Sequence, residues 1–80
     1  MERTIEIVSD AALGDAGLRE IVLKSNFGVI LEYEARAIAL EEASFDWVSG
    51  HDNGEVWKIE EVNMYDFDRT AYITLRPEKE

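Results

Sequence analysis

Neutral-pH acid–base chemistry in this 80-residue chain has to be sought first at His51, its one histidine. Histidine is the side chain whose unperturbed pKa lies nearest neutrality, so it comes first in any acid–base or metal-binding hypothesis. It stands beside Asp52-Asn53-Gly54, a sequence typical of a turn, and the chain has no second His and no Cys to complete a metal site. We therefore expect His51 to be a solvated turn residue.

Carboxylates are the other candidate chemistry, as cation ligands or as an acid–base pair. Two local clusters, Asp52-Asn53-Gly54 and Asp66-Phe67-Asp68, lack the ligand spacing of an EF-hand loop. An Asp or Asn side chain in a turn has a sufficient local role, because it forms a hydrogen bond with its own backbone. A glycosidase-type pair such as Glu41 with Glu60 requires a cleft, and no Ser lies in a nucleophile elbow. The sequence therefore predicts a non-enzymatic protein with no catalytic residue, no metal ion and no cofactor.

The balance of charge is the strongest chemical signal in the sequence. The chain has 18 acidic and 8 basic residues, a formal net charge of −10, and residues 41–80 hold eleven of the acids against four bases. The phosphates of nucleic acid and the anionic cytosolic leaflet repel such a protein, so we expect no direct binding to nucleic acid or membrane. The same field steers a basic protein partner toward the molecule. The alternative is that the excess acid only keeps a small protein soluble.

A partner site is expected where acids share a rigid face with aromatic side chains. Residues i and i+2 of a strand lie on one face about 6.6–6.8 Å apart, which predicts that Glu32 lies beside Glu34 and Asp66 beside Asp68. Aromatic residues are enriched at interfaces, so the aromatics nearest these acids are candidate anchors. The predicted partner-binding residues are Glu32, Glu34, Glu60, Glu61, Tyr65, Asp66, Phe67, Asp68 and Tyr72.

These residues must be positioned by one small domain that spans residues 1–80. Hydrophobic side chains make up 46% of the chain and cysteine is absent, a composition that supports folding and is typical of a reducing, cytoplasmic environment. No apolar run approaches the ~20 residues of a membrane-spanning helix. The alternation in residues 4–8 predicts a first strand.

Residues 11–25 carry the spacing of a helix. Apolar side chains recur there at intervals of three and four, and Ser9-Asp10 offers side-chain acceptors where a helix would begin. Gly14 and Gly17 weaken this prediction by about 1 kcal/mol each relative to Ala. A competing interpretation keeps a short helix at 10–16 and makes 18–24 a strand.

The segment that follows is ambiguous. Residues 29–33 have the composition of a strand. Residues 35–43 combine strong helix formers with period-2 spacing of their apolar positions, so helix and strand both stay open, with a slight preference for strand.

A hairpin is expected where two alternating aromatic runs, 44–49 and 55–59, flank an Asn-Gly in residues 50–54. Four large side chains would bury one another across this hairpin. They are Phe45, Trp47, Trp57 and Ile59.

The last third of the chain predicts a bulge, a turn and a strand. Residues 60–61 interrupt the inward phase, as an inserted residue would, and residues 66–69 form a turn. Ala71, Ile73 and Leu75 then alternate with polar residues before a frayed tail at 77–80. The predicted fold class is α+β: an antiparallel meander of roughly three to five strands with one N-terminal helix packed on one face.

The function predicted from these observations is that of an acidic, non-catalytic protein that covers a basic, nucleic-acid-binding surface of a partner protein. By class analogy, and without a shared motif, it is like the phage-encoded inhibitors that imitate nucleic acid, among them anti-CRISPR and anti-restriction proteins. The alternative is a structural or oligomerisation domain that pairs edge strands with a copy of itself, as a homodimer, or with a larger assembly. A carboxylate metal-dependent enzyme is the third interpretation.

Overall fold

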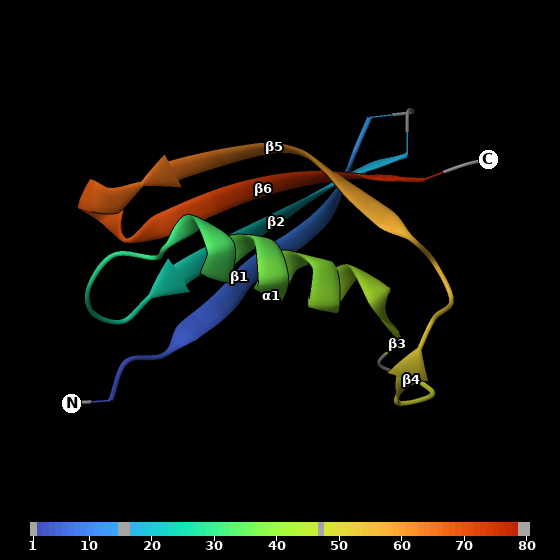
Figure 1. Ribbon diagram of the computed structural model, residues 1–80, viewed down its shortest axis with the longest axis horizontal. Helices are drawn as coiled ribbons and strands as arrows, with labels where there is room; N and C mark the ends of the chain where they lie inside the picture. The colour runs from blue at the N-terminus through green and yellow to red at the C-terminus, as the bar shows by residue number, and fades with distance from the viewer. Residues whose placement is uncertain (1, 15–16, 47, 79–80) are drawn as a thin grey trace.

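The computed structural model describes residues 2–14, 17–46 and 48–78. Within these residues there is one four-stranded antiparallel sheet, a second sheet of two short strands, one α-helix and one 3-10 turn. The elements are β1 (Ile5–Leu13), β2 (Leu18–Ser25), α1 (Glu32–Ser44), β3 (Phe45–Asp46), β4 (His51–Asp52), β5 (Trp57–Tyr65), η1 (Asp66–Asp68) and β6 (Thr70–Pro77). α1 crosses one face of the larger sheet (Figure 1). The predicted α+β class is therefore confirmed.

The order of the strands differs from a simple meander. The larger sheet runs β1-β2-β6-β5, and every neighbouring pair is antiparallel. Two hairpins, β1–β2 and β5–β6, are thus joined through α1, and β6 rather than β5 lies beside β2. The helix follows β2, so its predicted N-terminal position is wrong.

β1 and β2 pair where the spacing predicted a helix over 11–25, whereas the first strand predicted at 4–8 is confirmed as part of β1. β1 pairs with β2 from Ile5 opposite Ser25 to Leu13 opposite Leu18. Gly14 and Gly17 both have positive φ, 60° and 77°, which glycine adopts without the steric cost that other residues meet. The strand at 18–24 in the competing interpretation is confirmed. The helix at 10–16 is wrong where the structure describes it, since residues 10–13 belong to β1, and residues 15–16 lie outside the described residues.

Residues 32–44 form α1, so the strand predicted at 29–33 is wrong and the open segment 35–43 is helical. Ala35, Ala39 and Ala43 are fully buried at intervals of four residues, on one face of the helix. Small side chains at these positions let the helix axis lie close to the sheet. The strong helix propensity of the segment therefore outweighs its period-2 spacing.

The hairpin predicted around residues 50–54 is displaced. Phe45 pairs with Asp52 and Asp46 with His51 in the β3–β4 sheet, while Trp57 pairs with Pro77. Asp46 accepts the N–H groups of residues 48 and 49 at 2.9 and 3.3 Å, and these bonds lower the pKa of Asp46. This turn closes earlier than the Asn-Gly signal indicated, and Trp57 and Ile59 lie opposite β6 rather than opposite Phe45. Trp47 lies outside the described residues.

The end of the chain follows the prediction more closely. The register of β5 shifts between Ile59 and Glu61, which confirms the bulge, and residues 66–68 turn the chain into β6. Ala71, Ile73 and Leu75 are fully buried. In the tail predicted to fray, Pro77 belongs to β6 and the Glu78 N–H donates to the Val56 carbonyl at 2.8 Å, while residues 79–80 lie outside the described residues.

The core lies between α1 and the face of the sheet that it covers. Its buried residues come from β2, the loop after it, α1 and β6, and they are Ile21, Leu23, Ile30, Ala35, Ala39, Ala43, Ala71, Ile73 and Leu75. The opposite face of the sheet, called the open face below, carries the alternate residues of each strand. Exposed side chains such as Lys24, Lys58, Glu61 and Tyr65 lie there.

Candidate partner-binding site

The turn between β5 and β6 lies at the end of the sheet where α1 begins (Figure 1). Arg69 adopts a left-handed conformation with φ of 54°, and its N–H donates to the Asp66 carbonyl at 3.1 Å. The Ser25 N–H donates to the Arg69 carbonyl at 2.9 Å, and the Arg69 guanidinium donates to the Ser25 carbonyl at 3.3 Å. These bonds tie the turn to the end of β2 and hold its exposed residues in place.

Phe67 is the most exposed aromatic residue of this turn, with 98% of its surface accessible. It lies between Asp66 and Asp68, which are also exposed. A 3-10 helix has about three residues per turn, so three consecutive side chains point in directions about 120° apart. The predicted strand face shared by Asp66 and Asp68 is therefore wrong, and the turn instead surrounds an aromatic ring with two diverging carboxylates.

Tyr65 and Tyr72 form an aromatic pair on the open face. Tyr72 follows Ala71 and precedes Ile73, both buried under α1, so its ring points to the other side of the sheet, as the sequence predicts. The two ring centroids lie 5.3 Å apart with an interplanar angle of 87°, an edge-to-face contact. Both rings stay partly exposed, 49% for Tyr65 and 36% for Tyr72.

A shallow hollow of about 280 Å³ lies beside this pair, and we call it the tyrosine pocket. It spans three strands and the turn, and its lining residues are Glu20, Asn63, Tyr65, Asp68, Thr70 and Tyr72. Glu20 comes from a segment that the spacing assigned to a helix, so sequence reasoning missed it. Asn63 and Thr70 carried no signal beyond their place opposite Tyr72 and Tyr65 in the β5–β6 register.

Glu60 and Glu61 have different environments at the bulge. Glu61 is exposed and lies opposite Thr74 on the open face, four residues from Tyr65 along β5, or about 13 Å at the rise of a strand. The Glu60 carboxylate instead lies 2.6 Å from the Arg76 guanidinium. The structure thus places Glu61 on the same face as Tyr65 and Tyr72, whereas Glu60 forms an ion pair with Arg76.

Glu32 and Glu34 lie in the first turn of α1 rather than on a strand. Residues two apart on a helix point about 200° away from each other, so the predicted shared face is wrong. Glu32 pairs with Arg36 at 3.0 Å, one helical turn away. The Glu34 carboxylate receives two bonds of 2.8 Å from the Arg3 guanidinium. Both acids therefore already have a cationic partner within the chain.

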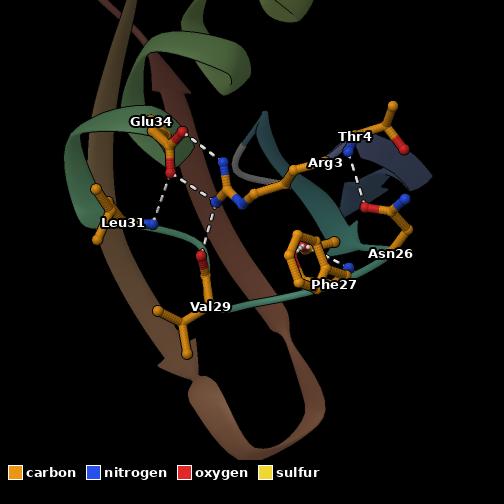
Figure 2. A network of polar contacts seen from close by, with 8 residues as sticks. Arg3, Thr4, Asn26, Phe27, Val29, Leu31 and Glu34 are labelled. Atoms are coloured by element: carbon orange, nitrogen blue, oxygen red, sulfur yellow. Dashed lines mark hydrogen bonds and ion pairs between the residues drawn. The ribbon is translucent and has the colours of Figure 1, made fainter. Parts of the chain in front are cut away.

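Glu34 is the centre of a polar network that Figure 2 shows from close by. The Leu31 N–H donates to Glu34 at 2.9 Å, and Arg3 also donates to the Val29 carbonyl at 2.6 Å (Figure 2). The Arg3 and Leu31 bonds lower the pKa of Glu34 to about 2. Asn26 accepts the Thr4 N–H at 2.8 Å. The network fastens the chain before β1 to the β2–α1 loop, a structural role that no spacing in the sequence indicated.

A fourth ion pair lies at the far end of α1. The Arg19 guanidinium donates to both carboxylate oxygens of Asp10 at 2.6 and 2.5 Å and to the Ala43 carbonyl at 3.3 Å. It also lies 5.4 Å from the Trp57 ring centroid, in cation–π range. Arg19 lowers the pKa of Asp10. This cluster joins β1, β2, α1 and β5, and its cation is fully engaged within the chain.

His51 is exposed in β4, as expected of a solvated residue. Among residues 2–14, 17–46 and 48–78, no three or more His, Cys, Asp or Glu side chains are arranged to hold a metal ion. The helix in this part of the chain is too short and too polar to cross a membrane.

No protein-family model, curated protein or solved structure matches this chain. The candidate site therefore has to be interpreted from its own geometry.

Proposed function

We propose that this is a non-catalytic binding protein whose open face and β5–β6 turn cover a basic surface on a partner protein. The surface comprises Glu20, Glu61, Tyr65, Asp66, Phe67, Asp68 and Tyr72, and we call it the acidic hairpin surface. The observation that carries the proposal is Phe67, an aromatic ring held 98% exposed between two carboxylates on a turn bonded to β2. An exposed ring gains nothing from folding, whereas aromatic anchors contribute much of the affinity of protein interfaces.

The charges of this surface support a basic partner. Glu32, Glu34, Glu60 and Asp10 are in ion pairs. Among the described residues, by contrast, Glu20, Glu61, Asp66 and Asp68 form no ion pair with a base. Their charges remain available to attract and orient a cationic surface, and the net charge of −10 adds a long-range field of the same sign.

The partner surface that we propose is a nucleic-acid-binding groove of a cytoplasmic protein, because a strongly basic surface on a protein is commonly a nucleic-acid-binding one. The protein would then act as an inhibitor that competes with nucleic acid for this groove. Anti-CRISPR and anti-restriction proteins that imitate nucleic acid act in the same way. The strand-face pairing expected of Glu32 with Glu34 and of Asp66 with Asp68 does not contribute. What remains is the aromatic anchor, the unpaired carboxylates and the overall charge.

The test is capture of partners from candidate host lysates by the immobilised protein, over a range of salt concentrations and with added duplex DNA as competitor. We expect a nucleic-acid-handling protein that is lost at high salt and displaced by the DNA. Asp66→Asn combined with Asp68→Asn should weaken capture, whereas Glu41→Gln, an exposed acid on α1, should not. Capture that is unchanged by salt, DNA and the double variant would contradict the proposal.

A second function, self-assembly through an edge strand, is favoured by one observation. β1 is nine residues long and pairs with β2 on one side only. A groove of about 310 Å³, lined by Ile7, Ile38, Glu41, Glu42 and Phe45, separates it from α1. Sedimentation velocity separates the two functions, because edge pairing predicts a concentration-dependent dimer that Val8→Lys abolishes, and the leading proposal predicts a monomer.

A further inference from the structure

The register of β2, β6 and β5 fixes the position of the tyrosine pocket. Val22 of β2, Tyr72 of β6 and Asn63 of β5 form one row across the open face. The next row toward the turn contains Thr70 and Tyr65. Tyr72 thus stands on β6, an inner strand of the sheet, with Val22 on its β2 side and Asn63 on its β5 side, and the pocket is a product of the fold rather than of one loop.

The pocket combines aromatic faces with carboxylates. In an edge-to-face pair, one ring uses a single face and the other only its edge, so most of the ring faces of Tyr65 and Tyr72 lie outside their mutual contact. Glu20 lines the pocket from β2 and Asp68 from the turn. Within the part of the chain that the structure describes, neither carboxylate is in an ion pair.

A planar cation fits this chemistry. A guanidinium group can stack on a tyrosine face and at the same time donate hydrogen bonds to a carboxylate, which an ammonium group does less well. Asn63 and Thr70 supply further acceptors at the same place. Lys24 lies on the same face opposite Thr70, a lining residue, and is exposed, so it is a cation of this chain that borders the pocket.

We propose that the tyrosine pocket binds the guanidinium group of an arginine side chain, stacked on Tyr72 or Tyr65 and paired with Asp68 or Glu20. The inference rests on the proposed function, since it names the side chain by which a basic partner would engage the acidic hairpin surface. It predicts that the partner inserts one arginine into the pocket while Phe67 packs against an apolar part of its surface.

The test uses a small probe and needs no knowledge of the partner. Titration of the ¹⁵N-labelled protein with N-acetyl-arginine amide at low salt should give saturable shifts at the amides of Asn63, Thr70 and Tyr72. The matched probe N-acetyl-citrulline amide has the same shape without the charge and should bind at least about fivefold more weakly, because it loses the cation–π and ionic contacts. Equal binding of citrulline, or equally tight binding of the lysine derivative, would overturn the assignment. Shifts spread evenly over the acidic surface without saturation would do the same.

Variants locate the binding in the pocket. Asp68→Asn should weaken arginine binding about threefold, the scale of an exposed ion pair, and Tyr72→Leu about fivefold. Lys24→Gln should strengthen it, because a competing cation is removed, and Glu41→Gln on α1 should leave it unchanged. The same spectra show whether Tyr72→Leu alters the fold. If it does, Tyr65→Leu serves as the second aromatic variant. Arginine binding that Asp68→Asn and both tyrosine variants leave unchanged would contradict the inference.

The outcome of the arginine titration can be distinguished from the outcome of the partner-capture test of the proposed function. Salt-sensitive, DNA-displaced capture of a partner without arginine binding would leave the acidic hairpin surface in place and refute the pocket. Saturable arginine binding in the absence of any captured partner would support the pocket and count against the proposed function.

Discussion

Replacement of Phe67 by Ala separates a binding role for this ring from a structural one. If the ring is a partner anchor, its removal should leave the folded state intact. The side chain is 98% exposed, so folding removes almost none of its surface from water. We therefore expect the free energy of unfolding to change by less than about 0.5 kcal/mol, as for other surface substitutions.

If Phe67 were buried in solution, its replacement by Ala would change the free energy of unfolding by a much larger amount. A Phe that is buried in solution, against its own chain or against a second copy, would cost about 3–5 kcal/mol when truncated to Ala. Ile73→Val provides the internal control, because Ile73 lies fully buried on the strand that follows the same turn. Its loss of one methylene should cost about 0.5–1.5 kcal/mol.

Urea unfolding followed by tryptophan fluorescence measures these differences. With a slope of about 1 kcal/mol per molar urea for a chain of this size, Phe67→Ala should move the midpoint by less than about 0.5 M. A loss of about 2 kcal/mol or more would refute the interpretation of Phe67 as a free anchor. Repeating the experiment at a tenfold higher protein concentration would then show whether a second copy covers the ring.

The helix–sheet contact, the Arg3–Glu34 pair and the first turn each give a further expectation. Ala39→Leu should destabilise the protein by about 1–3 kcal/mol in urea unfolding, because the helix has no room for a larger side chain there. The pKa of Glu34 is lowered from 4.5 to about 2, so its stabilising contribution is complete above pH 4.5 and disappears as the pH falls toward 2. The difference in urea midpoint between the wild type and Glu34→Gln should shrink over that interval. Gly17→Ala should lower the melting temperature, at a cost of about 1 kcal/mol, because φ is 77° there.

The second half of the sheet could be predicted because its local patterns and its tertiary contacts agree. Ala71, Ile73 and Leu75 alternate without interruption, and all three face α1. The break at residues 60–61 is a true change of phase, since the register shifts there. In such segments the sequence period and the burial period are the same, and sequence reasoning succeeds.

In the first half the strand at 4–8 was predicted, but the preferred interpretations of residues 11–25 and 35–43 were wrong, for physical reasons that differ between the two segments. In residues 5–25 a bulge between Ile7 and Ser9 interrupts the alternation of β1, and the pairing of β2 with β6, distant in sequence, decides the structure. In α1 the buried residues Ala35 and Ala39 are four apart. A spacing of four also satisfies a period of two, so the pattern could not separate helix from strand.

The errors at the candidate site follow from these structural errors. Glu32 and Glu34 were paired on a strand that is a helix, and Arg3, at a distance of 31 residues, neutralises the second of them. Glu20 was hidden in a segment assigned to a helix. The aromatic members Tyr65, Phe67 and Tyr72 were placed correctly on an exposed surface, because they lie in the half whose alternation is unambiguous.

The central claim is that the acidic hairpin surface binds a basic partner through an exposed aromatic anchor. The most direct measurement compares partner capture by the immobilised wild type, Phe67→Ala and Val48→Ala at low salt. Val48 is equally exposed, at 98%, but lies in the turn at the opposite end of the molecule. We predict that Phe67→Ala loses most of the captured partner and that Val48→Ala retains it. Equal capture by all three proteins would contradict the account.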